Sequence, residues 1–159
     1  MRAGRQRGFT LVAGLITAAV MAAGLASLAT FASHAMQREK ETELLFVGNQ
    51  FREAIASYYR KEQTYPTELA VLLEDRRYPM PVRHLRKLYR DPVTGSTDWG
   101  LVKAPEGGIM GVHSKSERLP IKTGNFLARD RVFGEAKTYS DWQFVHAPLA
   151  SPPGAKPES

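Results

Sequence analysis

A long uncharged stretch near the N-terminus limits the folds open to this chain more than any other feature. No charged side chain occurs between Arg7 and Arg38, and residues 9–35 are rich in alanine, leucine and valine. A helix of about 20 apolar residues crosses a bilayer, so the stretch predicts one membrane-spanning helix. Basic residues beside a span stay on the cytoplasmic side, and three arginines lie in residues 1–8. We therefore expect a single-pass protein with a cytoplasmic N-terminus.

Length and composition restrict the rest of the chain. Once the long helix and a polar tail are set aside, roughly 90 residues remain for a globular domain, which is marginally stable at that size. Packing on the helix would stabilise it. The chain has no cysteine, which excludes disulfides and thiolate metal sites. Its net charge is +6, and the arginines of residues 1–8 contribute three of these charges, so the remainder is only mildly basic.

Helical periodicity continues beyond the uncharged stretch. Residues 37–61 contain no proline, and their apolar side chains recur at spacings of three and four, which is typical of a helix with one apolar face. The residues of this predicted packing face are Leu44, Val47, Phe51, Ile55 and Tyr58. We expect one helix over residues 9–61, about 80 Å long. The charged residues at 38–43 are expected to form a solvated collar.

The next part of the chain predicts a short helix and a turn. Pro66 lacks an N–H and ends the long helical region. Leucines recur over residues 67–76, with Thr67 as the expected N-cap. Proline and glycine at residues 91–95 predict a tight turn.

The C-terminal part predicts a small antiparallel sheet. Residues 99–103 and 109–114 form a predicted hairpin across a glycine-containing turn, and residues 139–146 alternate as a third strand. Residues 115–138 are expected to be a long polar loop, and residues 148–159 a disordered tail. Helices followed by such a sheet indicate an α+β fold. The expected core residues of the sheet are Trp99, Trp142 and Phe144.

Three sequence elements carry a resemblance to a known family. The junction Gly8-Phe9-Thr10-Leu11 resembles the processing site of type IV pilin-like proteins, and the resemblance implies cleavage after Gly8 and methylation of Phe9. Tyr65-Pro66, and Asp91-Pro92-x-x-Gly95 followed by Trp99, resemble the G-type pseudopilins of type II secretion. The resemblance covers residues 4–147. It departs at Ala13, where the family usually has a glutamate, which favours a minor, initiating or divergent subunit.

The resemblance implies a pilin-like architecture and a structural function. It divides the chain into a leader at 1–8, a transmembrane helix at 9–35, a periplasmic half-helix at 36–61, a globular domain at 62–147 and a tail at 148–159. It implies a non-enzymatic subunit of a type II secretion filament in the periplasm, which aids the export of folded proteins. It also implies location in the inner membrane. The implied partners are other pseudopilins, the inner-membrane secretion platform and a prepilin peptidase.

Two alternatives remain open. One is a minor pilin of a type IV pilus or a DNA-uptake system. The other is a periplasmic protein with a cleavable signal peptide, for which Ser33-His34-Ala35 offers a small-x-small cleavage site. The uncharged run is longer than the apolar core of a usual signal peptide, about 7–15 residues.

The sequence shows no catalytic motif, and we expect neither enzymatic activity nor a cofactor. The four histidines lack metal-ligand spacing. The resemblance to G-type pseudopilins implies calcium as a candidate ligand, with Asp130, Glu135 and Asp141 as the residues that would bind it. Basic residues interleave with these acids, however, and disfavour a cation. The basic run at residues 76–90 is expected to be a solvated edge or to pair with acids of a neighbour, and no recognition motif supports DNA binding.

Overall fold

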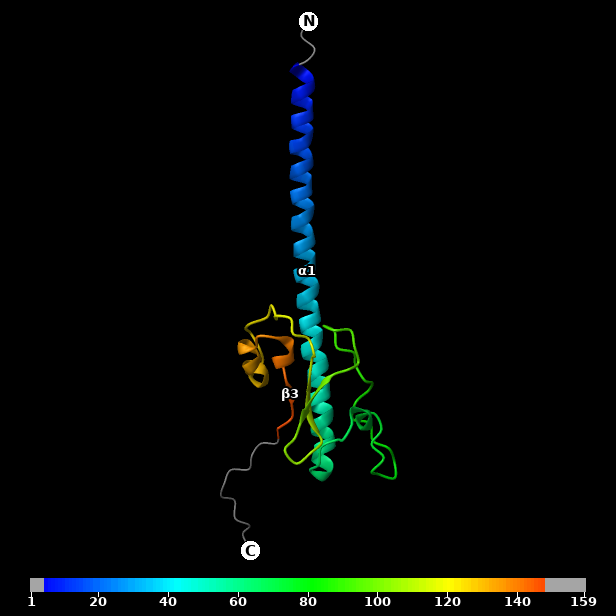
Figure 1. Ribbon diagram of the computed structural model, residues 1–159. Coiled ribbons are helices and arrows are strands. Elements are labelled where there is room, and N and C mark those ends of the chain that lie inside the picture. The colour runs from blue at the N-terminus through cyan, green and yellow to red at the C-terminus, as the bar shows by residue number, and fades with distance from the viewer. Residues whose placement is uncertain (1–4, 148–159) are drawn as a thin grey trace. The chain divides into compact units, whose positions relative to one another are not determined.

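The computed structural model describes residues 5–147, and it describes side-chain surroundings for residues 11–21 and 33–147. The expected disordered tail at 148–159 lies outside the described residues. The helices are α1 (Arg5–Glu62) and the short 3-10 helices η1 (Leu69–Leu72), η2 (Ala128–Glu135) and η3 (Tyr139–Asp141). The strands are β1 (Gly100–Lys103), β2 (Ile109–His113) and β3 (Phe144–Val145) (Figure 1). The predicted α+β class is confirmed.

Helix α1 is continuous and covers the whole range, residues 9–61, over which the sequence predicts one helix. Its end is set by Gln63, which adopts φ 56° and donates its N–H to the carbonyl of Tyr59 at 2.7 Å. This left-handed residue closes the last turn as a C-cap does. The chain divides into two compact units, Met1–Glu39 and Lys40–Ser159. The described residues of the first unit are all helical, and the second unit contains the described sheet.

The prediction of a single-pass inner-membrane protein is wrong. Within the part of the chain that the structure describes, no helix contains a stretch with both the length and the apolar character that a membrane crossing requires. The prediction rested on the length of residues 9–35, their content of alanine, leucine and valine, and the absence of charged side chains. A crossing requires about 20 predominantly apolar residues in one helix.

The described sheet has the order β1-β2-β3, and both pairs of strands are antiparallel. Leu101 pairs with Val112, and Gly111 pairs with Val145. Gly107 and Gly108 form the hairpin turn with φ values of 98° and 82°, which glycine adopts without steric cost. The predicted hairpin is therefore present.

The third strand is much shorter than predicted. The prediction covered residues 139–146, but residues 139–141 form η3 and only Phe144–Val145 pair with β2. Asp141 explains the difference, because its carboxylate accepts the backbone N–H groups of Lys137 and Thr138, each at 2.9 Å. Such a capping arrangement satisfies these donors in a helical turn, which competes with a strand.

The predicted helix over residues 67–76 is also shorter, and Thr67 is not its cap. Only η1 is helical there, and Glu68 is the N-cap residue, without a side-chain capping bond. The chain leaves the helix because Asp75 exchanges two backbone hydrogen bonds with Val82, at 2.8 and 3.1 Å. This bridge brings residues 75 and 82 together, with turns and bends between them. The predicted loop at 115–138 includes η2.

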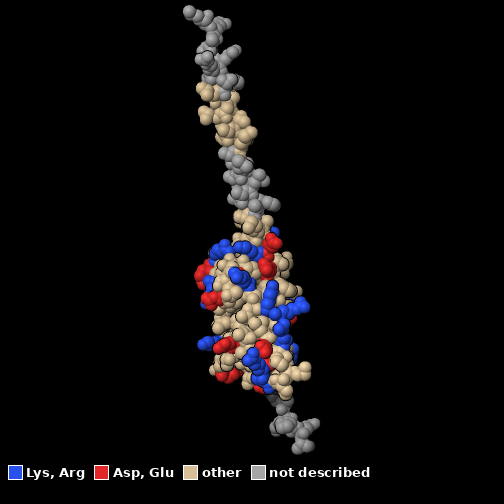
Figure 2. Space-filling model, turned by 90° about the vertical axis from the view of Figure 1, so that its right-hand side faces the viewer, with Lys and Arg blue, Asp and Glu red and all other residues tan. Residues whose placement is uncertain are grey.

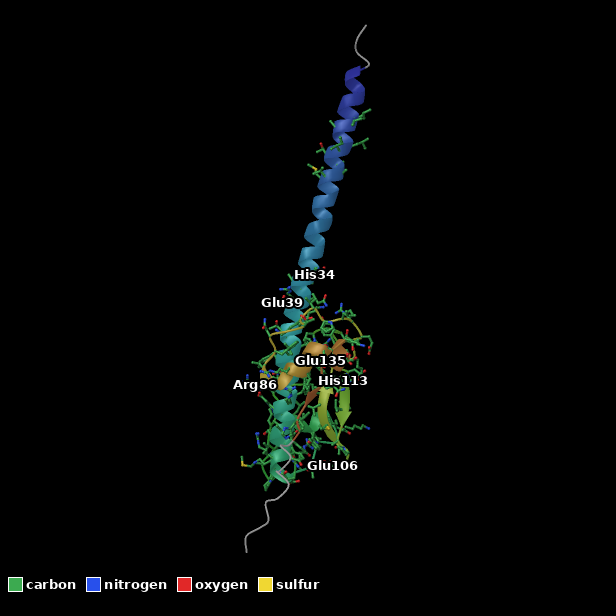
Figure 3. The ribbon with its side chains drawn as sticks, turned by 90° about the vertical axis from the view of Figure 1, so that its left-hand side faces the viewer. His34, Glu39, Arg86, Glu106, His113 and Glu135 are labelled. Carbon is green, nitrogen blue, oxygen red and sulfur yellow. The ribbon has the colours of Figure 1, made fainter. Side chains whose placement is uncertain are left out.

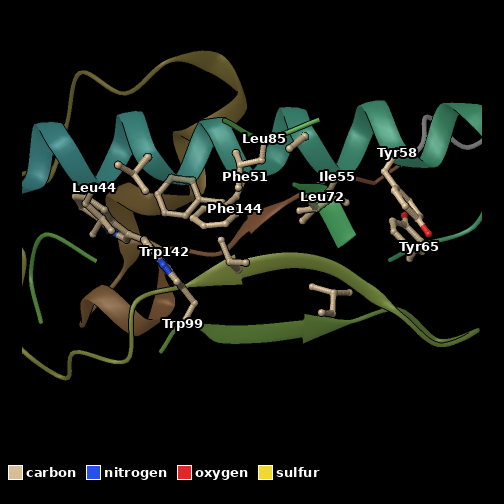
Figure 4. Close-up of a cluster of buried hydrophobic side chains, with 14 of the residues drawn as sticks. Leu44, Phe51, Ile55, Tyr58, Tyr65, Leu72, Leu85, Trp99, Trp142 and Phe144 are labelled. Atoms are coloured by element: carbon tan, nitrogen blue, oxygen red, sulfur yellow. The ribbon is translucent and has the colours of Figure 1, made fainter. Parts of the chain in front are cut away.

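The core of the second unit lies between one face of α1 and the sheet (Figure 4). The five residues of the predicted packing face and the three predicted sheet residues all lie in it, exposed by 7% or less. The Phe144 ring packs directly against the backbone of Gly48, because a Cβ at that position would overlap the ring. The packing face thus includes a close contact between the helix backbone and an aromatic ring.

Candidate functional site

Residues 11–21 of α1 form an apolar surface, which we name the helix surface. Their large apolar side chains are exposed by 55–71%: Leu11, Val12, Leu15, Ile16, Val20 and Met21. The hydroxyl of Thr17 donates to the carbonyl of Ala13 at 2.8 Å, so this polar side chain is satisfied within the helix. Apolar patches of this extent mark interaction sites. The helix surface is therefore suited to bury itself against another apolar surface.

Gly8 and Phe9, the predicted processing site, lie within α1, but their side-chain surroundings lie outside the described residues. Ala13 and Gly14 are exposed, and a Cβ at Gly14 would meet nothing within 4 Å. A neighbouring helix could approach closely at these small residues.

A buried carboxylate joins α1 to the long loop of the second unit. Glu41 is 2% exposed, and its oxygens accept the Tyr139 hydroxyl at 2.9 Å and the N–H groups of Ile121 at 2.5 Å and Lys122 at 3.2 Å. The solvated collar predicted at residues 38–43 is wrong at this position. Its neighbour Glu43 is exposed, as a solvated side chain should be.

A second polar cluster joins the C-terminal part of α1 to residues 75–84. Asp75 is fully buried and receives the Arg77 guanidinium at 2.7 Å, while that guanidinium stacks over the Tyr58 ring at 3.6 Å. Hydrogen bonds from Arg77, above all, hold the pKa of Asp75 well below its usual value, and burial opposes them. The hydrogen bond with Asp75 in turn raises the pKa of Arg77. The pair therefore stays ionised.

The cluster also contains a serine–histidine–aspartate chain. His84 Nε2 lies 3.2 Å from Asp75 Oδ2, and His84 Nδ1 lies 2.9 Å from Ser57 Oγ. Because a carboxylate only accepts, Nε2 carries a hydrogen and donates it to Asp75. The three residue types are those of a hydrolase triad.

The backbone around Ser57 indicates that the Ser57–His84–Asp75 series has a structural role and not a catalytic one. Ser57 lies inside α1, where the neighbouring N–H groups bond carbonyls one turn back. They are thus not available to stabilise an oxyanion, which acyl transfer requires. Arg77 already neutralises Asp75. The hydrogen bonds of His84 with Ser57 and Asp75 connect residues 75–84 to α1.

The three candidate calcium ligands have other partners or surroundings. Asp130 accepts the Arg52 guanidinium at 2.7 Å, with both side chains largely buried, and Arg52 also donates to Asn49 at 2.7 Å. Asp141 caps η3, and Glu135 ends η2. Among the residues described, no three His, Asp or Glu side chains are grouped closely enough to hold a metal ion.

An open groove lies between α1 and the loop that precedes η2. Its volume is about 390 Å³, and Phe46 and Leu127 contribute exposed apolar side chains to it. Asn49, Arg129 and Asp130 add polar groups at its edge. Arg129 lies 3.7 Å from Glu53 across the groove. The groove's charged side chains largely compensate one another.

Sequence reasoning missed the Asp75–Arg77–His84 cluster. Its members lie in a region without regular periodicity, and His84 was treated as one of several unrelated histidines. No local signal marked them, because Ser57 and His84 lie 27 residues apart in sequence.

The chain was compared with protein-family models, curated proteins and solved structures, and no significant match was found.

Proposed function

We propose that this protein is a pseudopilin-like structural subunit of a type II secretion filament that aids export of folded proteins. In this proposal the helix surface at residues 11–21 packs against the same segment of other subunits. The second unit, which has its own core, is carried as the body of the subunit. The carrying observation is the contrast between these parts: six large apolar side chains are exposed within residues 11–21 of α1, while the body has a buried core of its own.

Two further features support this function over an enzymatic one. The Gly8-Phe9-Thr10-Leu11 junction stands directly before the helix surface, where a processed subunit would begin. The buried polar clusters around Glu41, Asp75 and Asp130 each join two segments of the body and are occupied by internal partners. Such clusters stabilise a body and leave few groups for chemistry.

Cross-linking of the full-length chain in cells tests the packing of the helix surface. Because the chain contains no cysteine, Leu15→Cys introduces one thiol on the helix surface. We expect oxidation to give disulfide-linked dimers of this variant. Arg60→Cys, an exposed position of α1 in the second unit, is the matched control and should remain largely monomeric. Equal cross-linking of both variants, or none at position 15, contradicts the proposed packing.

N-terminal sequencing and mass spectrometry of the mature protein test the type of subunit. A methylated Phe9 at the N-terminus is the expected result. A start at Met36 would overturn the proposal, because it removes the helix surface and indicates a cleavable signal peptide.

A further inference from the structure

One segment of the second unit concentrates cations close together in the sequence. Residues 76–90 contain six Lys or Arg and no Asp or Glu. Four of the cations, Arg83, Arg86, Lys87 and Arg90, have exposed side chains, and we name residues 83–90 the basic segment. Arg86 lies at the surface of the unit (Figure 3). Figure 2 shows Lys and Arg side chains gathered in a column on the body, with few acidic side chains among them.

The basic segment lacks internal ionic partners. Elsewhere in the body, Arg52 pairs with Asp130, Arg77 with Asp75, and Lys115 with Asp98, at 2.6–2.7 Å. Within the described part of the chain, no carboxylate lies at ion-pair distance from the four cations of the basic segment. Their charge is therefore available to an anionic partner.

The backbone of the basic segment is held in place. The N–H groups of His84 and Leu85 donate to the carbonyl of Leu72 at 2.9 and 2.8 Å, and Leu85 is 2% exposed. Trp99 Nε1 donates to the carbonyl of Tyr89 at 2.9 Å. The cations thus project from an ordered backbone, which lowers the entropy cost of binding compared with a mobile tail.

The aromatic rings nearby are not free to stack on nucleic-acid bases. Lys87 lies over the Tyr89 ring at 5.2 Å, and Tyr89 meets Phe51 edge-on at 6.3 Å. The ring of Tyr78 has Lys61 at 5.4 Å and Arg77 at 5.9 Å. Single-stranded nucleic acids bind through open stacking platforms, and double-stranded DNA is read by a helix or a strand pair in its major groove. The basic segment lies outside the helices and strands.

The chemistry of the basic segment matches carboxylates of a protein. Three of its four cations are arginines, whose planar guanidinium binds a carboxylate through two parallel hydrogen bonds. Leu88, 40% exposed between them, adds an apolar contact that a protein chain can use. We propose that residues 83–90 bind an acidic segment of a partner protein. This inference does not rest on the proposed filament function.

Binding measurements with the full-length chain at low ionic strength test the inference. The probes are a fluorescent polyglutamate peptide, single-stranded DNA of matched length, and vesicles that contain anionic lipid. We expect the peptide to bind most tightly. The double variant Arg86→Gln/Lys87→Gln should weaken peptide binding about tenfold, since two charge contacts are lost.

The matched control is Arg76→Gln/Lys115→Gln, which removes one arginine and one lysine that already pair with Glu74 and Asp98. This control should weaken peptide binding by less than about twofold, as is usual for paired surface charges. Absence of peptide binding, tighter binding of DNA or vesicles, or equal weakening by both double variants overturns the inference. Each of these outcomes leaves the cross-linking result for the helix surface unaffected, so the two proposals fail separately.

Discussion

Two parts of the same helix have opposite relations to solvent. In residues 44–58 of α1, apolar side chains recur on one face and are buried against the rest of the second unit. In residues 11–21, large apolar side chains point to all sides and are exposed. A single apolar stripe can be covered by one small domain, whereas a helix that is apolar on all sides needs neighbours all around it. Residues 44–58 therefore stabilise the second unit, whereas residues 11–21 are suited to bury against another apolar surface.

The largest expected difference between residues 44–58 and residues 11–21 is in the free energy of unfolding after a large side chain is removed. Phe51→Ala removes a fully buried side chain that contacts Trp99 at 5.2 Å between ring centroids, and should lower the free energy of unfolding by about 3–5 kcal/mol. Leu15→Ala, on the helix surface, should change it by less than about 0.5 kcal/mol. Chemical denaturation of both variants measures the difference. Similar losses would mean that residues 11–21 are also buried within the subunit.

The next largest loss of stability is expected from the buried ion pair of Asp75 and Arg77, which contacts the C-terminal part of α1. Asp75→Asn leaves Arg77 without its carboxylate partner and should lower the free energy of unfolding by roughly 3 kcal/mol at neutral pH. Because the pKa of Asp75 is depressed in the folded protein, its stabilisation is present above the unfolded value near 3.8 and is lost as pH falls below it. Denaturation from pH 7 to pH 2 should therefore show a weaker acid dependence in the variant. An unchanged pH profile contradicts this assignment.

A smaller effect is expected at the carboxylate that joins α1 to the loop. Glu41→Gln removes a charge that three donors satisfy, and should cost about 1–3 kcal/mol. Amide hydrogen exchange at Ile121 and Lys122, whose N–H groups bind Glu41, should become faster. The exposed neighbour offers a control, since Glu43→Gln should leave both amides unchanged. Equal protection in the two variants would show that Glu41 does not hold the loop.

The smallest effect distinguishes two glycines of α1. Alanine favours a helix over glycine by about 1 kcal/mol, so Gly14→Ala should slightly stabilise the chain, because a Cβ there has open space. At Gly48 the Cβ would overlap the Phe144 ring, and overpacking should reverse the sign, with a net loss of about 1–2 kcal/mol. Thermal unfolding of both variants measures the signs. A gain at both positions would mean that the ring moves aside easily.

Local signals in the sequence predicted part of the fold correctly. The periodicity of Leu44 to Tyr58 and the absence of proline predicted one helix, and glycines at 107 and 108 predicted the hairpin. The single-pass prediction is wrong because no helix in the described part of the chain has both the length and the apolar character of a membrane span. The third strand was predicted too long, because the capping carboxylate of Asp141 competes locally with strand pairing.

The groups around the candidate sites could be predicted less well. Glu41 precedes Leu44 by three residues and so lies near the buried face of α1, which was a usable signal. Its partners Ile121 and Lys122, however, lie 80 and 81 residues away. For the basic segment, the sequence predicted the excess of positive charge but did not decide which cations pair internally. Arg77 is drawn into the body by Asp75, whereas Arg86 remains exposed.

The sequence by itself determined the long helix, its apolar stripe, the α+β class and the excess of positive charge at residues 76–90. These properties depend on neighbours a few residues apart, since helical periodicity and turn chemistry are local. The tertiary structure alone decided that Glu41 and Asp75 are buried with partners, that Ser57 and His84 meet, and which cations stay free. Such pairings join distant segments, and only the packing of the whole body brings those segments together.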